Sequence, residues 1–297
     1  MFERHSLHGV IYYTSRLLQT HGFPHLFATR FGGVSTGAFD SLNVSTSRKD
    51  ENGCTDTAEN VAANYARALS VIGVSPEKAA AAKQVHSDNI AEATEAFDGS
   101  NILPFRTRTD GFDGLITRAS DEESPKAVCV KTADCTPILL ADITTGDVCA
   151  VHAGWRGTVA DITANAAMML SHGKPENVSA AIGPCIGKCC YEVGDEVYFA
   201  AKDLFERSGK RFDEERLCPV FACCSLGGKR HFDLAGTNKQ RLLDIGVPAA
   251  NIETSGICTA CFTDEYGTRP FFSHRASGGH SGTFVSLIAK KINKRAE

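Results

Sequence analysis

Three side chains that commonly bind metal ions stand in dense local motifs of this 297-residue chain. They are His86 in a Gln-Val-His triplet, Cys135 within Ala-Asp-Cys-Thr-Pro, and His152 at the head of His-Ala-Gly-Trp-Arg-Gly. Two imidazoles and one thiolate form a zinc-binding set that leaves a fourth position open, as catalytic zinc sites do. Cys135 and His152 end neighbouring apolar runs and His86 lies far upstream, so only a folded sheet brings all three together.

The same residues also fit an enzyme without metal, in which Cys135 is the nucleophile and His152 is its general base. His86 favours the metal interpretation, because a Cys–His dyad has no need of a second imidazole. The sequence leaves both interpretations open. For a general acid the candidates are Asp113 and Asp134, although either carboxylate also suits a role in ordering its loop.

Loops that combine glycine with arginine predict an anion site close to these ligands. His152 leads through two glycines and Arg156 into an expected helix, and a helix N-terminus favours an anion. The planar guanidinium fork is suited to phosphate. A second glycine-bearing turn contains Arg30 and leads to Asn43 and Arg48. We therefore expect these four side chains to contact phosphate or a sugar; the alternative is that they are ordinary turn residues.

Other motifs allow both a functional and a structural role. Phe271 and Phe272 stand beside a cationic segment, where an aromatic ring stacks on a flat ligand or packs in the core. The loop 183–187 suits either a ligand contact or a turn before the next helix. The cysteine pairs are a second metal or redox candidate, but a single C-x-x-C without a matching pair is a weak zinc signal; they are Cys189-Cys190, Cys223-Cys224 and Cys258-x-x-Cys261.

The hydrophobic periodicity predicts a mixed α/β fold in one domain covering residues 1–297. Apolar residues at intervals of three and four predict helices over 57–72, 158–170, 195–206 and 234–245. Short β-branched runs predict strands over 25–29, 113–117, 127–131, 138–142, 148–152, 178–182 and 284–288. The turn 144–147 predicts a hairpin, and 93–110 and 118–125 are expected to be loops. Because the strands come in clusters with helices between them, a layered α/β arrangement is favoured over a regular parallel sheet.

Composition limits the classes of function. The chain is 42% hydrophobic and 22% charged, as is usual for a globular enzyme. Its net charge of -4 does not indicate a nucleic-acid-binding protein, which would usually carry an excess of basic residues. No apolar run approaches the roughly 20 residues of a membrane span. The first residues lack the charged-then-apolar pattern of a secretion signal. We therefore expect a cytoplasmic protein that acts on small molecules, with no nucleic-acid or membrane partner; the sequence does not indicate its oligomeric state.

Taken together, the motifs resemble one family over nearly the whole chain. It is the family long described as multicopper polyphenol oxidases, or laccase-like proteins, and now regarded as zinc-dependent purine nucleoside phosphorylases. The His-Ala-Gly-Trp-Arg-Gly and Ala-Asp-Cys blocks are the most specific. The matching segments are Thr29–Ser35, Ser41–Asn43, Gln84–His86, Asp113–Leu115, Ala133–Pro137, His152–Gly157, Gly183–Ile186, Tyr191–Val193, Cys258–Thr259 and Phe271–Arg275.

The resemblance implies a metal on the positions of His86, Cys135 and His152, in agreement with the ligand chemistry. It implies a layered sandwich of β-sheets flanked by helices, similar to a deamidating toxin domain that uses a Cys–His dyad. The implied activities are phosphorolysis of adenosine, inosine and methylthioadenosine to the base and a ribose 1-phosphate, and deamination of adenosine to inosine. Zinc would activate water for the deamination, and Arg30, Arg48 and Arg156 would hold phosphate.

Two positions depart from the family pattern. A Thr-Gly-Arg segment is usual where this chain has Ser281-Gly282-Thr283, so one cation is lost. His274 stands where an aromatic residue is more usual. Substrate affinity or choice is expected to differ if the missing arginine binds substrate. The competing functions are the metal-free Cys–His hydrolase and a copper oxidase of phenols; copper is disfavoured because the chain lacks the His-x-His pairs of a multicopper centre.

Overall fold

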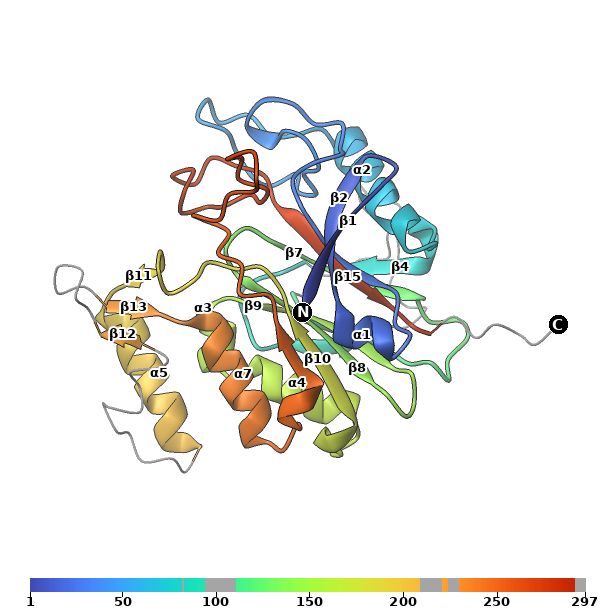
Figure 1. Cartoon of the computed structure of the whole chain (residues 1–297), viewed down its shortest axis with the longest axis vertical. Helices are drawn as coiled ribbons and strands as arrows, with labels where there is room; N and C mark the ends of the chain where they lie inside the picture. The colour runs from blue at the N-terminus through green and yellow to red at the C-terminus, as the bar shows by residue number, and fades with distance from the viewer. Residues whose placement is uncertain (82, 94–110, 209–220, 224–229, 292–297) are drawn as a thin grey trace.

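Two six-stranded β-sheets pack face to face, and helices cover their outer sides (Figure 1). The computed structural model describes residues 1–81, 83–93, 111–208, 221–223 and 230–291. The mixed α/β layered architecture predicted from the sequence is confirmed. The similarity to a deamidating toxin stays a prediction. In the described part of the chain, no helix has both the length and the apolar character that crossing a membrane requires.

The first sheet contains both ends of the described chain. Its strands are antiparallel except for the parallel pair β4 and β7. Helix α2 (Ala58–Val71) packs on its outer face, and the short helix α1 (Arg16–Thr20) follows its second strand. In spatial order the strands are β1 (Phe2–Leu7), β2 (Val10–Ser15), β3 (His25–Ala28), β15 (Phe284–Ala289), β7 (Ala127–Thr132) and β4 (Ala79–Ala81).

The second sheet contains the strands that lead into the candidate metal ligands. Helices α3 (Trp155–Val159), α4 (Ile162–Leu170) and α7 (Leu234–Asp244) lie on its outer side (Figure 1). Its pairs β10–β14 and β5–β6 are parallel and the others antiparallel. In spatial order its strands are β14 (Ile252–Thr254), β10 (Val178–Ile182), β8 (Thr136–Asp142), β9 (Val148–Ala153), β6 (Gly114–Thr117) and β5 (Ile90–Glu92).

Strands β7 and β8 are buried on both faces, and their alternation explains the layers. On β8, Leu139 and Ala141 join the core between the sheets, whereas Ile138 and Leu140 pack against the outer helices. Successive side chains of a strand point to opposite faces, so a strand covered on both sides reads as a continuous apolar run. The apolar runs in the sequence are therefore the central strands of this sandwich.

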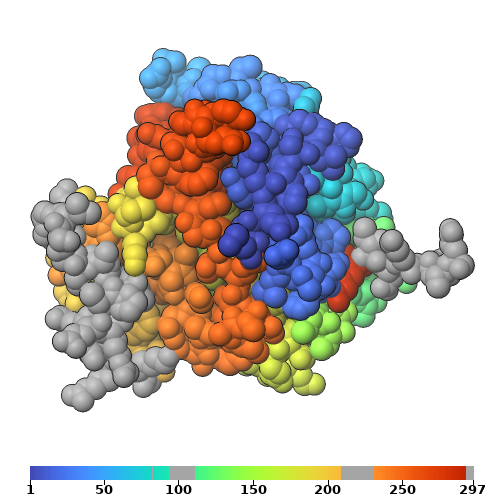
Figure 2. Space-filling view, in the orientation of Figure 1, coloured from blue at the N-terminus to red at the C-terminus, as the bar shows by residue number. Residues whose placement is uncertain are grey.

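A third, small sheet extends from the second one beside helix α5 (Asp195–Arg207). Its strands are β11 (Glu192–Val193), β13 (Arg230–Phe232) and β12 (Phe221–Cys223). Phe232 is fully buried in the cluster that joins this sheet to α5. The N-terminal hairpin lies against residues 255–280, as Figure 2 shows, with the Tyr13 and Phe271 rings 5.7 Å apart.

The sequence predicted most of the longer elements, but it missed a break in one helix and the N-terminal hairpin. The helix expected over 158–170 is two helices, because Asp161 adopts a left-handed conformation (φ 69°) and separates α3 from α4. Arg241 stabilises this break with two hydrogen bonds to Asp161, of 2.9 and 2.8 Å. The hairpin of β1 and β2 was not predicted, because its turn is formed by His8 and Gly9, and histidine at positive φ is an uncommon turn residue. The turn at 144–147 and the loop at 118–125 are confirmed, while 94–110 lie outside the described residues.

The buried, neutral ring of His25 makes the stability of the core depend on pH. Its Nε2 accepts a hydrogen bond from the Ser15 amide and its Nδ1 donates to the Phe23 carbonyl, both at 2.8 Å. Burial lowers the pKa of His25 to about 4. The unfolded state takes up a proton near pH 6.5, so this contribution to stability is complete above that pH and is lost as pH falls towards 4.

We expect the free energy of unfolding to fall by on the order of 2 kcal/mol between pH 7 and 5 through His25 alone. Urea unfolding of the wild type and of His25→Gln at both pH values measures it, because the amide keeps a donor and an acceptor but does not titrate. Equal pH dependence in the two proteins would contradict the assignment.

Candidate active site

The three predicted metal ligands meet at the ends of two central strands of the second sheet, β8 and β9. His86 lies in the loop between β4 and β5, Cys135 immediately precedes β8, and His152 is the penultimate residue of β9. Strands β8 and β9 pair with Pro137 opposite His152, which brings Cys135 to the end of β9. The ligand atoms of the three residues all lie within 4.8 Å of one another. A folded sheet does bring them together, as their spacing required.

Asp113 positions both histidines. Its carboxylate accepts a 2.7 Å hydrogen bond from Nδ1 of His152, and its carbonyl accepts the His152 amide at 2.7 Å. The same carboxylate accepts the backbone amides of the loop around His86, at 3.3 Å from Val85, 3.1 Å from His86 and 2.7 Å from Ser87. Because Nδ1 of His152 is engaged, Nε2 is the ring atom left to bind a metal.

Hydrogen bonding keeps Asp113 ionised although it is fully buried. Burial alone would raise the pKa of this carboxyl, but its hydrogen bonds from His152 and Ser87 lower the pKa to about 2. Holding the loop also requires His86 to adopt a left-handed conformation, with φ 60°. Asp113, which the sequence suggested as a general acid, is therefore occupied as the carboxylate that orients both histidines.

Gly154 leaves the space in which the ligands meet. A Cβ at this position would lie 3.2 Å from Sγ of Cys135 and 3.2 Å from Cδ2 of His86. The φ of Gly154 is -72°, which any residue can adopt. A larger residue would therefore crowd the three side chains around this position, whereas the backbone itself would accept it.

The charges of the site suit both candidate chemistries. In the protein without metal, burial would raise the pKa of Cys135, but His152 and His86 lower it to about 6. Burial likewise would lower the pKa of His152, but the Cys135 thiolate and Asp113 raise it to about 9. A thiolate is the form that binds zinc or acts as a nucleophile. His152 is buried, Cys135 is half-buried and His86 is exposed, so the cluster opens to solvent on the His86 side.

Asp134 holds together the segments around Cys135 that contain Ile186, Thr259 and Arg275. We call this set of contacts the frame under Cys135. Its carboxylate accepts the Thr259 hydroxyl and the Arg275 amide, both at 2.7 Å. Its carbonyl accepts the amide of Ile186 at 2.9 Å. Asp134 also has a positive φ of 92°. Both of its carboxylate oxygens are used in holding loops together, so its suggested role as a general acid is replaced by a structural one.

A cationic group lies beside this frame. Arg48 donates from Nη2 to Nδ1 of His274 at 2.9 Å, and its Nε is buried with no hydrogen-bond partner among the described residues. Burial lowers the pKa of Arg48, while the negative charges of Cys135 and Asp134 oppose that shift. Arg275 donates to the carbonyls of Cys190 and Glu192. The sequence singled out Arg48 as a substrate contact, whereas His274 was noted only as a departure from the family pattern and Arg275 only as part of a matching segment.

Tyr191 is a site residue that the sequence analysis did not select. Burial, followed by the charge of Cys135, raises its pKa to about 12, and the Arg275 guanidinium lies 5.5 Å from its ring centroid. Its position in the Tyr-Glu-Val motif was the only available signal, because nothing in that spacing places the ring beside Cys135.

The other predicted substrate contacts differ in their surroundings. Arg30 is half-buried, with Nε donating to the Asp40 carbonyl at 2.7 Å and its guanidinium over the Phe272 ring. Arg156 is exposed in α3, over Trp155 and 3.7 Å from Glu196. Asn43 is a correction: it is fully buried, and its amide bonds to Ser45, Asp56 and Thr283 within the scaffold. Phe271 and Phe272 are buried in the core, which decides their role in favour of packing.

Comparison with known proteins identifies the family of this chain. Residues 24–291 match the model of the family described as multi-copper polyphenol oxidoreductase laccase. The chain belongs to this family. The matched region includes the three candidate ligands, Asp113 and the frame built on Asp134.

Relatives of known name cover most of the chain. A purine nucleoside phosphorylase of Bacteroides thetaiotaomicron is 34% identical over 267 residues, which are 89% of this chain and 90% of that protein. The adenosine deaminase RL5, from an unknown prokaryotic organism, is 36% identical and covers 74% of this chain and 78% of its own. The crystal structure of YlmD from Geobacillus stearothermophilus superposes with a TM-score of 0.79 at 28% identity, covering 98% of this chain and 99% of that one.

Replacing Asp113 with asparagine should weaken metal binding by roughly ten- to hundred-fold, because it removes the carboxylate that orients both histidines. Competition with a chromogenic chelator measures the affinity, with His86→Ala as the reference that lacks a ligand. The control is Asp88→Asn, an exposed aspartate in the same loop. Unchanged affinity in Asp113→Asn would show that the hydrogen bonds to Asp113 do not organise the ligands.

Replacing Gly154 with alanine should disturb the ligands without unfolding the protein. Forcing a methyl group into a filled space costs about 1–3 kcal/mol, or roughly ten- to hundred-fold in metal affinity. The control is Gly194→Ala, because a Cβ at Gly194 meets nothing within 4 Å. The same chelator assay and thermal melting distinguish a local effect from unfolding. Normal metal affinity in Gly154→Ala would contradict the packing argument.

Proposed function

We propose that this protein is a zinc-dependent purine nucleoside enzyme. It would catalyse phosphorolysis of adenosine, inosine and methylthioadenosine, and hydrolytic deamination of adenosine. The observation that supports this most strongly is the cluster of His86, Cys135 and His152, with Asp113 fixing one histidine and the loop of the other. The names of the relatives, a phosphorylase and an adenosine deaminase, agree with both activities. A cytoplasmic location belongs to the same proposal.

The donor set fits zinc. Two imidazoles and a thiolate are ligands of a catalytic zinc ion, and the exposed side of the cluster leaves space for a fourth ligand. When bound, zinc would supply Lewis-acid activation of water or of the purine leaving group. The protein contributes the rest: Asp113 holds His152 in the tautomer that presents Nε2, and Gly154 keeps the approach to the three ligands free.

The cationic group around Arg48 is the proposed phosphate seat. Arg48, Asp134 and Arg275 all lie near enough to His274 to affect its charge. Nε of Arg48 is a buried donor without a hydrogen-bond partner in the described structure. An unpaired buried donor costs free energy unless a ligand satisfies it. A phosphate oxygen is a suitable acceptor. This seat would hold phosphate for attack at the sugar carbon, while the metal ligands face the purine.

A metal-free Cys–His hydrolase is the second candidate. It is favoured by the mutual effect of the two side chains: His152 and His86 lower the pKa of the Cys135 thiol to about 6, and Cys135 and Asp113 raise the pKa of His152 to about 9. It assigns no function to His86, which lies in the same cluster. Removal of His86 therefore separates the two candidates.

The deciding experiment measures adenosine turnover in phosphate buffer and metal content for the wild type and His86→Ala. We expect adenine or inosine from the wild type and loss of activity by at least about a hundred-fold in the variant, as for removal of a group that acts in the transition state. The control is His8→Asn, an exposed hairpin residue. Activity that survives His86→Ala and a chelator but not a thiol reagent would replace the zinc proposal with the hydrolase.

Replacing Arg48 with glutamine should separate the two reactions. Loss of a charge-assisted hydrogen bond costs about 1.5–3 kcal/mol, so the KM for phosphate should rise by roughly ten- to hundred-fold. Deamination of adenosine uses no phosphate and should change far less. Initial rates at varied phosphate measure the first effect and inosine formation the second. An equal loss in both reactions would contradict a phosphate seat at Arg48 and point to damage at the metal ligands.

A further inference from the structure

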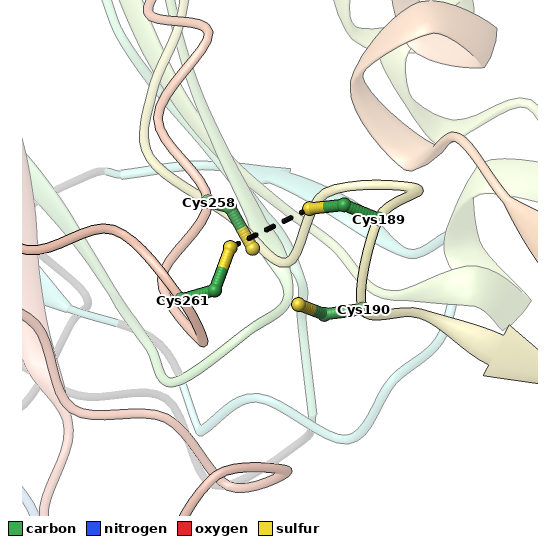
Figure 3. A group of neighbouring side chains, drawn as sticks. All are labelled: Cys189, Cys190, Cys258 and Cys261. Atoms are coloured by element: carbon green, nitrogen blue, oxygen red, sulfur yellow. Dashed lines mark hydrogen bonds between the residues drawn. The ribbon is translucent and has the colours of Figure 1, made fainter.

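A second cluster of metal-binding side chains lies outside the candidate active site. It consists of Cys189, Cys190, Cys258 and Cys261, whose four sulfur atoms all lie within 4.8 Å of one another. Figure 3 shows the four side chains converging from two loops. The sequence showed a Cys-Cys doublet and a C-x-x-C pair far apart in the chain, and neither alone was a strong signal. The fold supplies the matching pair that the sequence lacked.

Two segments that follow neighbouring strands bring the cysteines together. Cys189 and Cys190 lie in a turn after β10, and Cys258 and Cys261 lie in a turn after β14. Strands β10 and β14 are parallel, and the contact between them continues as a bridge between Cys185 and Cys258. Parallel strands release their chains at the same end of the sheet, so both turns lie side by side. The site is therefore built on the sheet and not on one flexible loop.

The backbone around the sulfur atoms is arranged as it is around metal-bound thiolates. The amide of Gly187 donates to Sγ of Cys258 at 3.2 Å. A Cβ at Gly187 would lie 3.2 Å from Sγ of Cys189 and 3.2 Å from Cβ of Cys258. Amide donors to sulfur and a glycine that admits close approach both fit ligands of a metal.

We propose that Cys189, Cys190, Cys258 and Cys261 form a structural binding site for a thiophilic divalent cation, with zinc as the expected ion. A tetrahedral zinc with Zn–S bonds of about 2.3 Å has S···S edges of about 3.8 Å. The sulfur atoms of Cys189 and Cys261 are 3.6 Å apart. A disulfide requires about 2.05 Å. Four protein ligands leave no open position, so this ion would hold the structure together and would not act in catalysis.

The position of this four-cysteine site connects it to the candidate active site. Thr259, between two of the cysteines, donates to the Asp134 carboxylate, and Ile186, near the other two, donates to the Asp134 carbonyl. Arg275 links the same two regions, because it donates from its amide to Asp134 and from its guanidinium to the Cys190 carbonyl. A metal that ties the two cysteine turns together therefore stabilises the frame under Cys135.

The test measures metal bound by full-length protein in which the first cluster has been removed by His86→Ala and His152→Ala. This background protein, purified with reductant and without chelator, should retain about one zinc per chain. Cys189→Ser with Cys261→Ser in the same background should remove it; both side chains are exposed, so folding should survive and circular dichroism verifies this. Cys54→Ser, at an exposed cysteine outside the cluster, is the control and should keep the zinc.

Cobalt provides a readout that needs no cysteine variant. The background protein loaded with Co²⁺ should show the sulfur-to-cobalt charge-transfer absorption and the intense visible bands of a tetrahedral thiolate site. It should also melt at a lower temperature after the metal is removed. Absence of zinc and of these bands would overturn the proposal, and thiol titration would then show whether Cys189 and Cys261 form a disulfide. Because His86 and His152 are already replaced, the result is independent of whether the first cluster binds zinc.

Discussion

The buried carboxylate of Asp113 is the interaction on which the candidate active site depends. One side chain holds the ring of a histidine on a strand and the backbone of the loop that carries a second histidine. The loop that carries His86 depends on it most, since His86 is exposed and adopts a left-handed conformation. The sandwich contributes by burying this carboxylate completely, which strengthens each of its hydrogen bonds.

Cys135, the third candidate ligand, is held by a second buried aspartate in a similar way. Asp134 uses a carboxylate and a carbonyl to fix the segments that surround Cys135, and one of these segments contains Cys258 and Cys261. Asp113 and Asp134 thus each hold in place the segments next to a candidate ligand. An enzyme that must hold three ligands from distant parts of the chain needs such supports, because a strand end alone does not fix a side chain.

The sequence indicated which residue types could do chemistry, but not which hydrogen bonds and contacts hold them in place. The meeting of His86, Cys135 and His152 could be predicted because two imidazoles and a thiol are residue types that recur together in active sites, and β8 and β9 could be predicted from their apolar runs. Asn43 could not be assigned correctly, since a buried amide that bonds to Asp56 and Thr283 looks the same in sequence as one that faces a substrate. Tyr191 and the four-cysteine site depend on contacts between distant segments, which no local pattern encodes. The split of the helix at Asp161 depended likewise on Arg241, far along the chain.

The unequal burial of the three ligands has a consequence for the kinetics of metal exchange. His152 is enclosed by the sheet, whereas His86 stands on an exposed loop whose attachment is a set of hydrogen bonds to one carboxylate. Ligands leave a metal one at a time, and the one on the least constrained segment leaves first. Escape of the ion would thus begin with opening of the His86 loop, a small local motion, and would not require the sandwich to unfold. The lifetime of a metal held by these residues would then be set by this loop, separately from the stability of the fold.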